Sequence, residues 1–96
     1  MRTLVLNREK RINGAWAPYY VFIDGQNCGN IGNGETINIP IDSNKHSIRI
    51  CADMGDGKHW SMEYVLSQGN YNLQYCIRTK IHLLSVDIYL EQVWTY

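Results

Sequence analysis

The residues of this sequence best suited to covalent chemistry are its three cysteines, Cys28, Cys51 and Cys76. A reactive thiol needs a neighbouring base and a lowered pKa. Alternation along the expected strands places Cys51 and Cys76 on one outward face with Arg49 and Arg78, whose positive charge would favour a thiolate. No histidine shares that face, because His46 has the opposite parity. The sequence therefore favours ordinary reduced thiols, and we expect that the protein is not an enzyme.

The spacing of the other reactive side chains predicts no metal site and no cofactor. Zinc ligands usually occur as close pairs, whereas the nearest His–Cys pair, His46 and Cys51, has opposite strand parity. The glycines of residues 29–34 reverse the spacing of the dinucleotide fingerprint, and no helical pattern follows them. Asp53 and Asp56 lack a further acidic ligand within the length of a calcium-binding loop.

Aromatic residues are abundant, with three Trp, seven Tyr and one Phe in 96 residues. Tyr and Trp combine a large apolar body with a polar group, which suits protein interfaces and sugar faces. Trp16 and Tyr19 lie beside an expected turn, and Trp94 and Tyr96 lie at the C-terminal end. These four are the candidate binding residues, against the simpler interpretation that they fill the rim of a small core.

Strands are expected to position these side chains, because apolar and polar residues alternate and no window holds a helical stripe. The expected strands lie in the segments 3–7, 19–23, 36–42, 46–52, 60–66, 71–77 and 84–90. Turn dipeptides such as Asn13-Gly14 and Asp24-Gly25 separate them every 8–12 residues. The sequence predicts one all-β domain over residues 1–96, an antiparallel β-sandwich of seven or eight strands of the immunoglobulin-like or prealbumin-like kind.

A two-residue hairpin loop is predicted at Gly69-Asn70, where glycine at the first position suits a type II′ turn. It sets Leu66 opposite Leu73 and completes a three-strand meander over residues 46–77. Trp60 has inward parity in this arrangement.

Two further expectations concern pairing and sheet edges. Matching faces across the preceding turn sets Ile48 opposite Tyr64. Pro40 cannot donate to a ladder, so its strand is expected at an edge or a bulge. The stretch 81–96 carries apolar residues at both parities, which indicates a central strand covered on both faces or a strand that covers a partner subunit.

Charge and composition narrow the partners and the compartment. Nine basic and nine acidic residues give a net charge of zero, which disfavours electrostatic binding to nucleic acid or to an anionic membrane. No apolar run approaches the roughly 18 residues that span a bilayer, and the N-terminus lacks a signal-like apolar stretch. An odd number of cysteines fits a reducing compartment. We expect a cytoplasmic protein that binds neither nucleic acid nor membrane.

Residues 19–52 resemble the PEGA-type modules and related small bacterial domains of unknown function with a carboxypeptidase-regulatory, prealbumin-like β-sandwich. The resemblance rests on the run Val21-Phe22-Ile23-Asp24-Gly25, on the glycine-bearing turn of residues 29–34, and on the strand opening His46-Ser47-Ile48. Asn44-Lys45 stands where the family usually has glycine before the histidine. The resemblance implies a non-catalytic, surface-presenting module and supplies no site residues.

The absence of a catalytic constellation and the surplus of aromatic residues favour a non-catalytic protein-interaction module. Self-association through the C-terminal strand, giving a homodimer or other homo-oligomer, is its most economical form. The alternative is a carbohydrate or small-ligand binding module that uses Trp16, Tyr19 and neighbouring turn asparagines.

Overall fold

The computed structural model describes residues 1–93, and its regular structure over these residues consists of nine strands. They are β1 (Arg2–Arg8), β2 (Tyr19–Ile23), β3 (Gln26–Ile31), β4 (Thr36–Ile41), β5 (His46–Asp53), β6 (Lys58–Trp60), β7 (Tyr64–Leu66), β8 (Leu73–Ile81) and β9 (Val86–Gln92). In this part of the chain there is no helix that could cross a membrane. The prediction of an all-β protein is confirmed, with more strands than the seven or eight expected.

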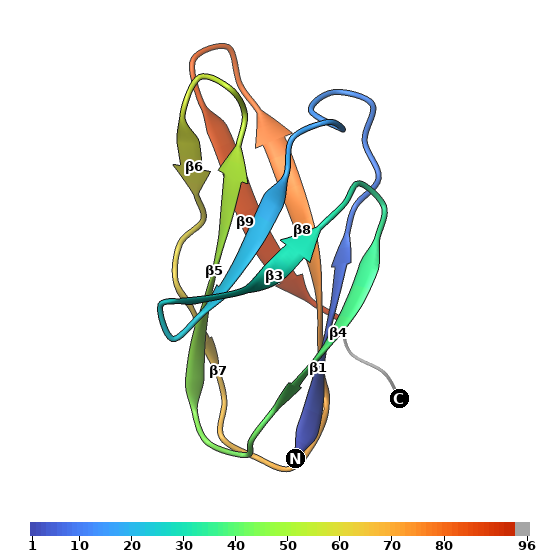
Figure 1. The fold of residues 1–96 in the computed structure, drawn as a ribbon, viewed down its shortest axis with the longest axis vertical. Helices are drawn as coiled ribbons and strands as arrows, with labels where there is room; N and C mark the ends of the chain where they lie inside the picture. The colour runs from blue at the N-terminus through green and yellow to red at the C-terminus, as the bar shows by residue number, and fades with distance from the viewer. Residues whose placement is uncertain (94–96) are drawn as a thin grey trace.

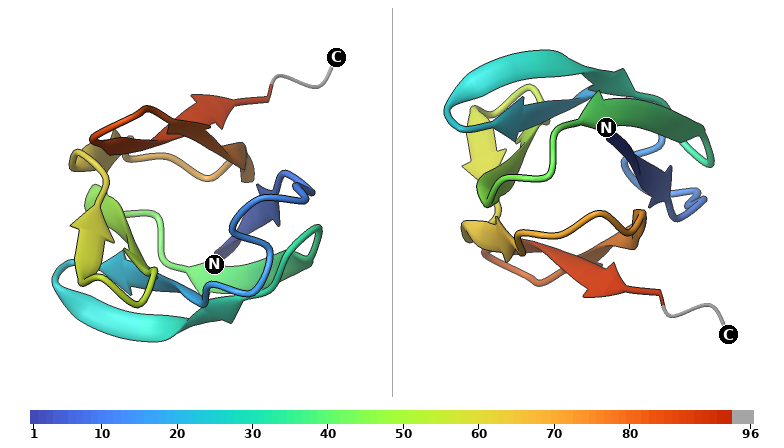
Figure 2. Two further views of the ribbon diagram at one scale, coloured as in Figure 1. Left: turned by 90° about the horizontal axis from the view of Figure 1, so that it is seen from above. Right: turned by 90° about the horizontal axis from the view of Figure 1, so that it is seen from below.

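The strands form two sheets that enclose one apolar core (Figures 1 and 2). The first sheet has the order β4-β1-β8-β9, and the second has the order β3-β2-β5-β6, with β7 also paired to β5. Along β1 and β2 every second side chain is buried, as the alternating pattern predicted. The fully buried side chains include Leu4, Leu6, Val21, Ile31, Ile48, Ile50, Leu66 and Ile77.

One strand pair departs from the expected antiparallel arrangement, because β1 and β8 run parallel, with Leu4 opposite Leu73. The connection over residues 67–72 leaves β7 in the second sheet and enters β8 in the first, so these two strands do not pair. The predicted hairpin at Gly69-Asn70, with Leu66 paired to Leu73, is therefore wrong. The two leucines are both buried, but they come from different sheets.

Gly69 belongs to the crossing connection instead of a hairpin loop. Its N–H donates to the carbonyl of Ser43 at 2.9 Å, which holds the connection against the β4–β5 turn. Its φ of 157° lies in a region that favours glycine, and a Cβ there would collide with the ring of Tyr71. Glycine is thus required at position 69 by its φ and by the nearby Tyr71 ring, and not by a hairpin turn.

Between β6 and β7 the chain carries one more residue than the stretch of β5 that it lies beside. This bulge changes the face of the sheet on which Trp60 lies. Ile48 pairs with Tyr64, as predicted, whereas Cys51 pairs with Trp60. A bulge reverses the parity of the residues beyond it. Trp60 therefore points outward and not into the core, which corrects the prediction.

The hydroxyl of the buried residue Ser61 supplies the hydrogen bonds that the strand ladder lacks at this bulge. Its Oγ accepts the N–H of Ile50 at 2.9 Å and donates to the carbonyl of Met62 at 2.8 Å. The N–H of Ser61 in turn donates to the carbonyl of Ile50 at 2.8 Å. The bulge is thereby fixed without leaving a buried donor unpaired.

The edge strands are partly as expected. Pro40 lies in β4, which is an edge strand of the first sheet, so that prediction is confirmed. The other edge of the same sheet is β9, so the C-terminal stretch does not form a central strand. Two of its apolar residues, Leu83 and Leu84, lie in the exposed turn before β9.

Arg8 joins the two sheets to the long β1–β2 connection. Arg8 is 4% exposed, and its guanidinium donates to three carbonyl oxygens: those of Ala17 at 2.8 Å, Ile31 at 3.0 Å and Gly14 at 3.1 Å. Its Cζ also lies 3.6 Å from the centroid of the Tyr19 ring. The Tyr19 hydroxyl hydrogen-bonds Thr79 of β8 at 2.7 Å, so the contacts span both sheets.

We expect Arg8→Met to lower the free energy of unfolding by about 2–4 kcal/mol, because carbonyl oxygens buried at this junction lose their donors. Urea denaturation measures the effect. The matched control is Arg49→Met, whose guanidinium lies over Trp60 on an outer face and whose loss should cost about 1 kcal/mol or less. Equal losses for the two variants would show that the Arg8 junction has no special role.

Candidate functional site

The strand β9 forms one edge of the first sheet, and no other strand of residues 1–93 pairs with its outer side. Natural sheets protect their edges with proline, bulges or very short strands. Among the edges formed by residues 1–93, β4 carries Pro40, β3 is bulged where its pairing with β2 shifts register, and β6 and β7 have three residues each. By contrast, β9 has seven residues without glycine, proline or a bulge.

The hydrogen bonds at both ends of the β8–β9 ladder show which groups of β9 are free. The N–H of Val93 donates to Gln74, and the N–H of His82 donates to Ser85, each at 2.8 Å. Bonded and non-bonded residue pairs alternate between these ends. The N–H and C=O groups of the even-numbered residues, including Ile88 and Leu90, therefore face away from β8 and toward the open edge.

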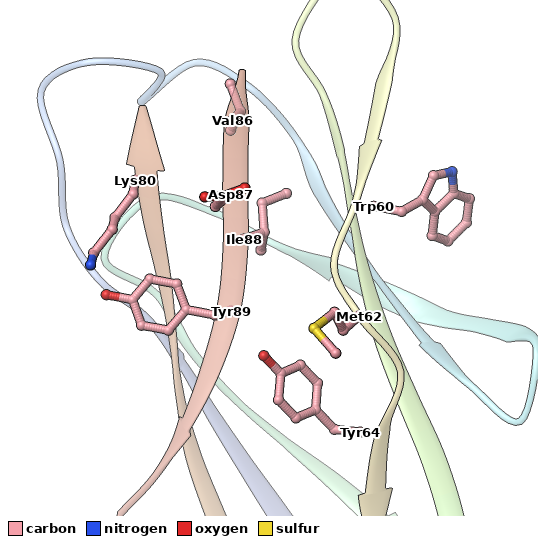
Figure 3. A pocket seen from close by; sticks show the side chains of 8 residues that line it. All are labelled: Trp60, Met62, Tyr64, Lys80, Val86, Asp87, Ile88 and Tyr89. Carbon is pink, nitrogen blue, oxygen red and sulfur yellow. The ribbon is translucent and has the colours of Figure 1, made fainter. Parts of the chain in front are cut away.

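A groove of about 450 Å³ runs along this edge, between β9 and the β6–β7 segment (Figure 3). Ile88, Met62 and Tyr64 lie around the gap in Figure 3, whereas the Trp60 ring points away from it. Met62 is 76% exposed although its side chain is apolar. The groove is suited to burying apolar side chains beside a strand that pairs with β9.

The outer face of the second sheet carries a group of aromatic side chains. The rings of Phe22 and Trp60 lie 5.0 Å apart at 58°, and the Cζ of Arg49 lies 4.5 Å from the Trp60 ring. Next to them is a depression of about 200 Å³, lined by Tyr20, Phe22, Asn27, Cys51, Asp53 and Lys58. The surface combines apolar ring faces with polar groups of both charges.

The structure separates the four predicted binding residues. Trp16 is 69% exposed in the β1–β2 connection, beside Gly55 of the β5–β6 turn. Tyr19 is 2% exposed and its hydroxyl is bonded to Thr79, so its proposed role as a surface binding residue is wrong. Trp94 and Tyr96 lie outside the described residues.

Sequence reasoning missed the outer-face group of Tyr20, Phe22 and Trp60. The alternation of β2 contained a signal for the first two, because burial of Tyr19 and Val21 directs Tyr20 and Phe22 outward. No feature of the sequence indicated the bulge that turns Trp60 to the same face.

The two thiols beside arginines do not have the surroundings of a nucleophile. Burial raises the pKa of the Cys51 thiol despite the opposing positive charges of Lys58 and Arg49. Burial also raises the pKa of Cys76 despite Arg78. Desolvation thus outweighs the guanidinium effect that the sequence suggested. The two cysteines also lie in different sheets, Cys51 in β5 and Cys76 in β8.

In a second pocket, lined in part by β4 and by the β2–β3 turn, His46 lies between two carboxylates. Its Nδ1 is 2.6 Å from Oδ2 of Asp24 and its Nε2 is 2.6 Å from Oδ1 of Asp42. Asp24 lies in the β2–β3 turn with φ of 51°, and its Oδ1 accepts the N–H of Ser47 at 2.9 Å. The imidazole therefore links that turn, the end of β4 and the start of β5.

Both ring nitrogens of His46 can donate only when the ring is protonated. The hydrogen bonds to Asp24 and then to Asp42 raise the pKa of His46, and the same contacts lower the pKa of both carboxyl groups. Over residues 1–93 we find no cluster of three His, Cys, Asp or Glu side chains that could hold a metal ion. Asp24, His46 and Asp42 thus form an ion-paired group that joins three segments of the chain, which we call the His46 clasp.

Comparison of the chain with protein-family models, with curated proteins and with solved structures finds no significant match.

We expect the His46 clasp to make stability depend on pH. Folding raises the pKa of His46 from its ordinary 6.5, so its contribution is present below 6.5 and is lost as the pH rises through the raised value. The pKa values of Asp24 and Asp42 fall from 3.8, so their contribution is lost as the pH falls below 3.8 through the lowered values.

The variant His46→Gln should remove the decline in the free energy of unfolding above pH 6.5 that the wild type shows in urea denaturation. The control His82→Gln, in the exposed turn before β9, should keep that decline. Parallel pH profiles for wild type and His46→Gln would contradict the assignment.

Proposed function

We propose that this chain is a non-catalytic protein-interaction module that binds by adding a strand to β9. The observation that carries the proposal is the regular edge of β9, unpaired within residues 1–93, beside a groove whose lining includes Met62, Tyr64 and Ile88. Self-association is the most economical form of this function, since every copy carries the same edge.

Two physical contributions support strand addition at β9. Main-chain groups of Ile88 and Leu90 face the open side and are available to pair with an incoming strand. Met62 is held in water at an energetic cost, and full burial of such a side chain stabilises a complex by about 1.5–3 kcal/mol. The incoming strand would supply backbone partners and cover Met62 at the same time.

We also propose that the two sheets form a β-sandwich of the immunoglobulin-like or prealbumin-like kind, and that the resemblance of residues 19–52 to PEGA-type modules reflects a common architecture. The position of the Ile23-Asp24-Gly25 run supports this, because it forms the β2–β3 turn. The contact between Asp24 and His46 also supports it, since both residues belong to the resembling segment.

A second candidate function is carbohydrate binding on the outer face of the second sheet. The depression beside Tyr20 and Phe22 favours it, because sugars bind aromatic ring faces flanked by polar groups, here Asn27, Asp53 and Lys58. These residues replace Tyr19 as the candidates for such a site.

We expect the protein to associate reversibly at micromolar concentration, and we expect Met62→Lys to weaken the association at least tenfold, because it replaces an apolar side chain that the partner would bury with a charged one. Sedimentation velocity measures both. The matched control is Val65→Lys, which adds the same charge at a side chain 56% exposed and outside the groove. A monomer at all concentrations, or equal weakening by the two variants, would contradict the proposal in its self-associating form.

If the outer face binds carbohydrate, a glycan array should show specific binding that Tyr20→Ala abolishes and Met62→Lys preserves. Tyr20 lines the depression and Met62 lies in the separate groove. No binding to any glycan on the array would remove this candidate.

A further inference from the structure

We infer that the partner strand at β9 is the β9 strand of a second copy, paired antiparallel about a two-fold axis that passes through Ile88. This inference rests on the function proposed above and specifies its partner and its register. The axis stands perpendicular to the first sheet, so the four-stranded sheets of the two copies become one continuous sheet.

The side chains of β9 restrict the registers that two copies can adopt. Leu90 and Ile88 face inward with Val86, whereas Asp87 and Glu91 face outward, as their pairing with β8 requires. A register that pairs an even-numbered with an odd-numbered residue would set buried apolar side chains opposite charged ones. Only a two-fold axis that passes through a residue, and not between two residues, pairs inward side chains with inward ones and outward side chains with outward ones.

Among axes near the middle of β9, the one through Tyr89 is disfavoured by charge. It would set Asp87 of each copy directly opposite Glu91 of the other, giving two pairs of like charges on one face. Like charges directly opposite one another destabilise a strand pair.

The axis through Leu90 avoids pairs of like charges, but it sets the apolar side chain of Ile88 opposite the polar side chain of Gln92 of the other copy. The axis through Ile88 sets Ile88 opposite itself and Val86 opposite Leu90, so the inner face is apolar at every central position. On the outer face this register sets Asp87 opposite Tyr89, which avoids the pairing of acids.

The main-chain groups favour the same axis. The N–H and C=O of Ile88 face the open edge, so the two Ile88 residues can exchange both hydrogen bonds. The inward side chains of the second β9 would then lie over the groove and cover Met62, the exposed apolar side chain on the opposite wall.

Disulfide trapping tests the register in a Cys28→Ser, Cys76→Ser background. Cα atoms of a directly opposed, hydrogen-bonded pair lie about 5.5 Å apart, which a disulfide can bridge. Under mild oxidation Ile88→Cys should cross-link two copies in high yield. Leu90→Cys should not, because in this register its counterpart lies four residues along the strand, about 13 Å away.

A variant that keeps the core intact provides an independent measure. Glu91→Gln should leave the dimer dissociation constant within about twofold if the axis passes through Ile88, but should tighten the dimer several-fold if Glu91 faces Asp87. Cross-linking through Leu90→Cys alone, or tightening by Glu91→Gln, would overturn the register while leaving self-association standing. A wild-type protein that sediments only as a monomer would overturn the inference together with the self-associating form of the function.

Discussion

The burial of the Arg8 guanidinium is the constraint on which the rest of the structure depends. Arg8 is 4% exposed and has no ion pair within residues 1–93. Main-chain carbonyls accept from its guanidinium and the Tyr19 ring covers one face, and these contacts offset the cost of burying the charge. Those carbonyls belong to the β1–β2 connection and to β3. The same interaction therefore fixes a long connection, orients Tyr19 and aligns the two sheets.

The two open sides of the molecule, where the edges of the sheets meet, are built differently. On one side, Asp24, Asp42 and His46 line a pocket of about 470 Å³, and the edge strands there carry Pro40 or a bulge. The other side has a regular strand, β9, which faces the short strands β6 and β7 across the groove that contains Met62. Proline and a bulge protect the edge strands of the first side against strand pairing, whereas β9 on the second side is a regular strand without either device.

The cysteines illustrate how burial competes with charge. A neighbouring guanidinium stabilises a thiolate, and the sequence correctly placed Arg49 near Cys51 and Arg78 near Cys76. Desolvation has the larger effect at both sites and raises the pKa of each thiol. Sequence spacing indicates which charges are close, but the depth of a side chain below the surface decides the sign of the shift.

The sequence by itself determined the strand-rich class, the inward residues of β1 and β2, the edge position of Pro40 and the pairing of Ile48 with Tyr64. These follow from local properties, namely the two-residue period of a strand and the missing donor of proline. The tertiary structure alone decided that β7 and β8 belong to different sheets, that β1 runs parallel to β8 and that Trp60 faces outward. Alternation reports only whether a side chain is buried, and Leu66 and Leu73 can both be buried whether their strands pair in one ladder or belong to different sheets around one core.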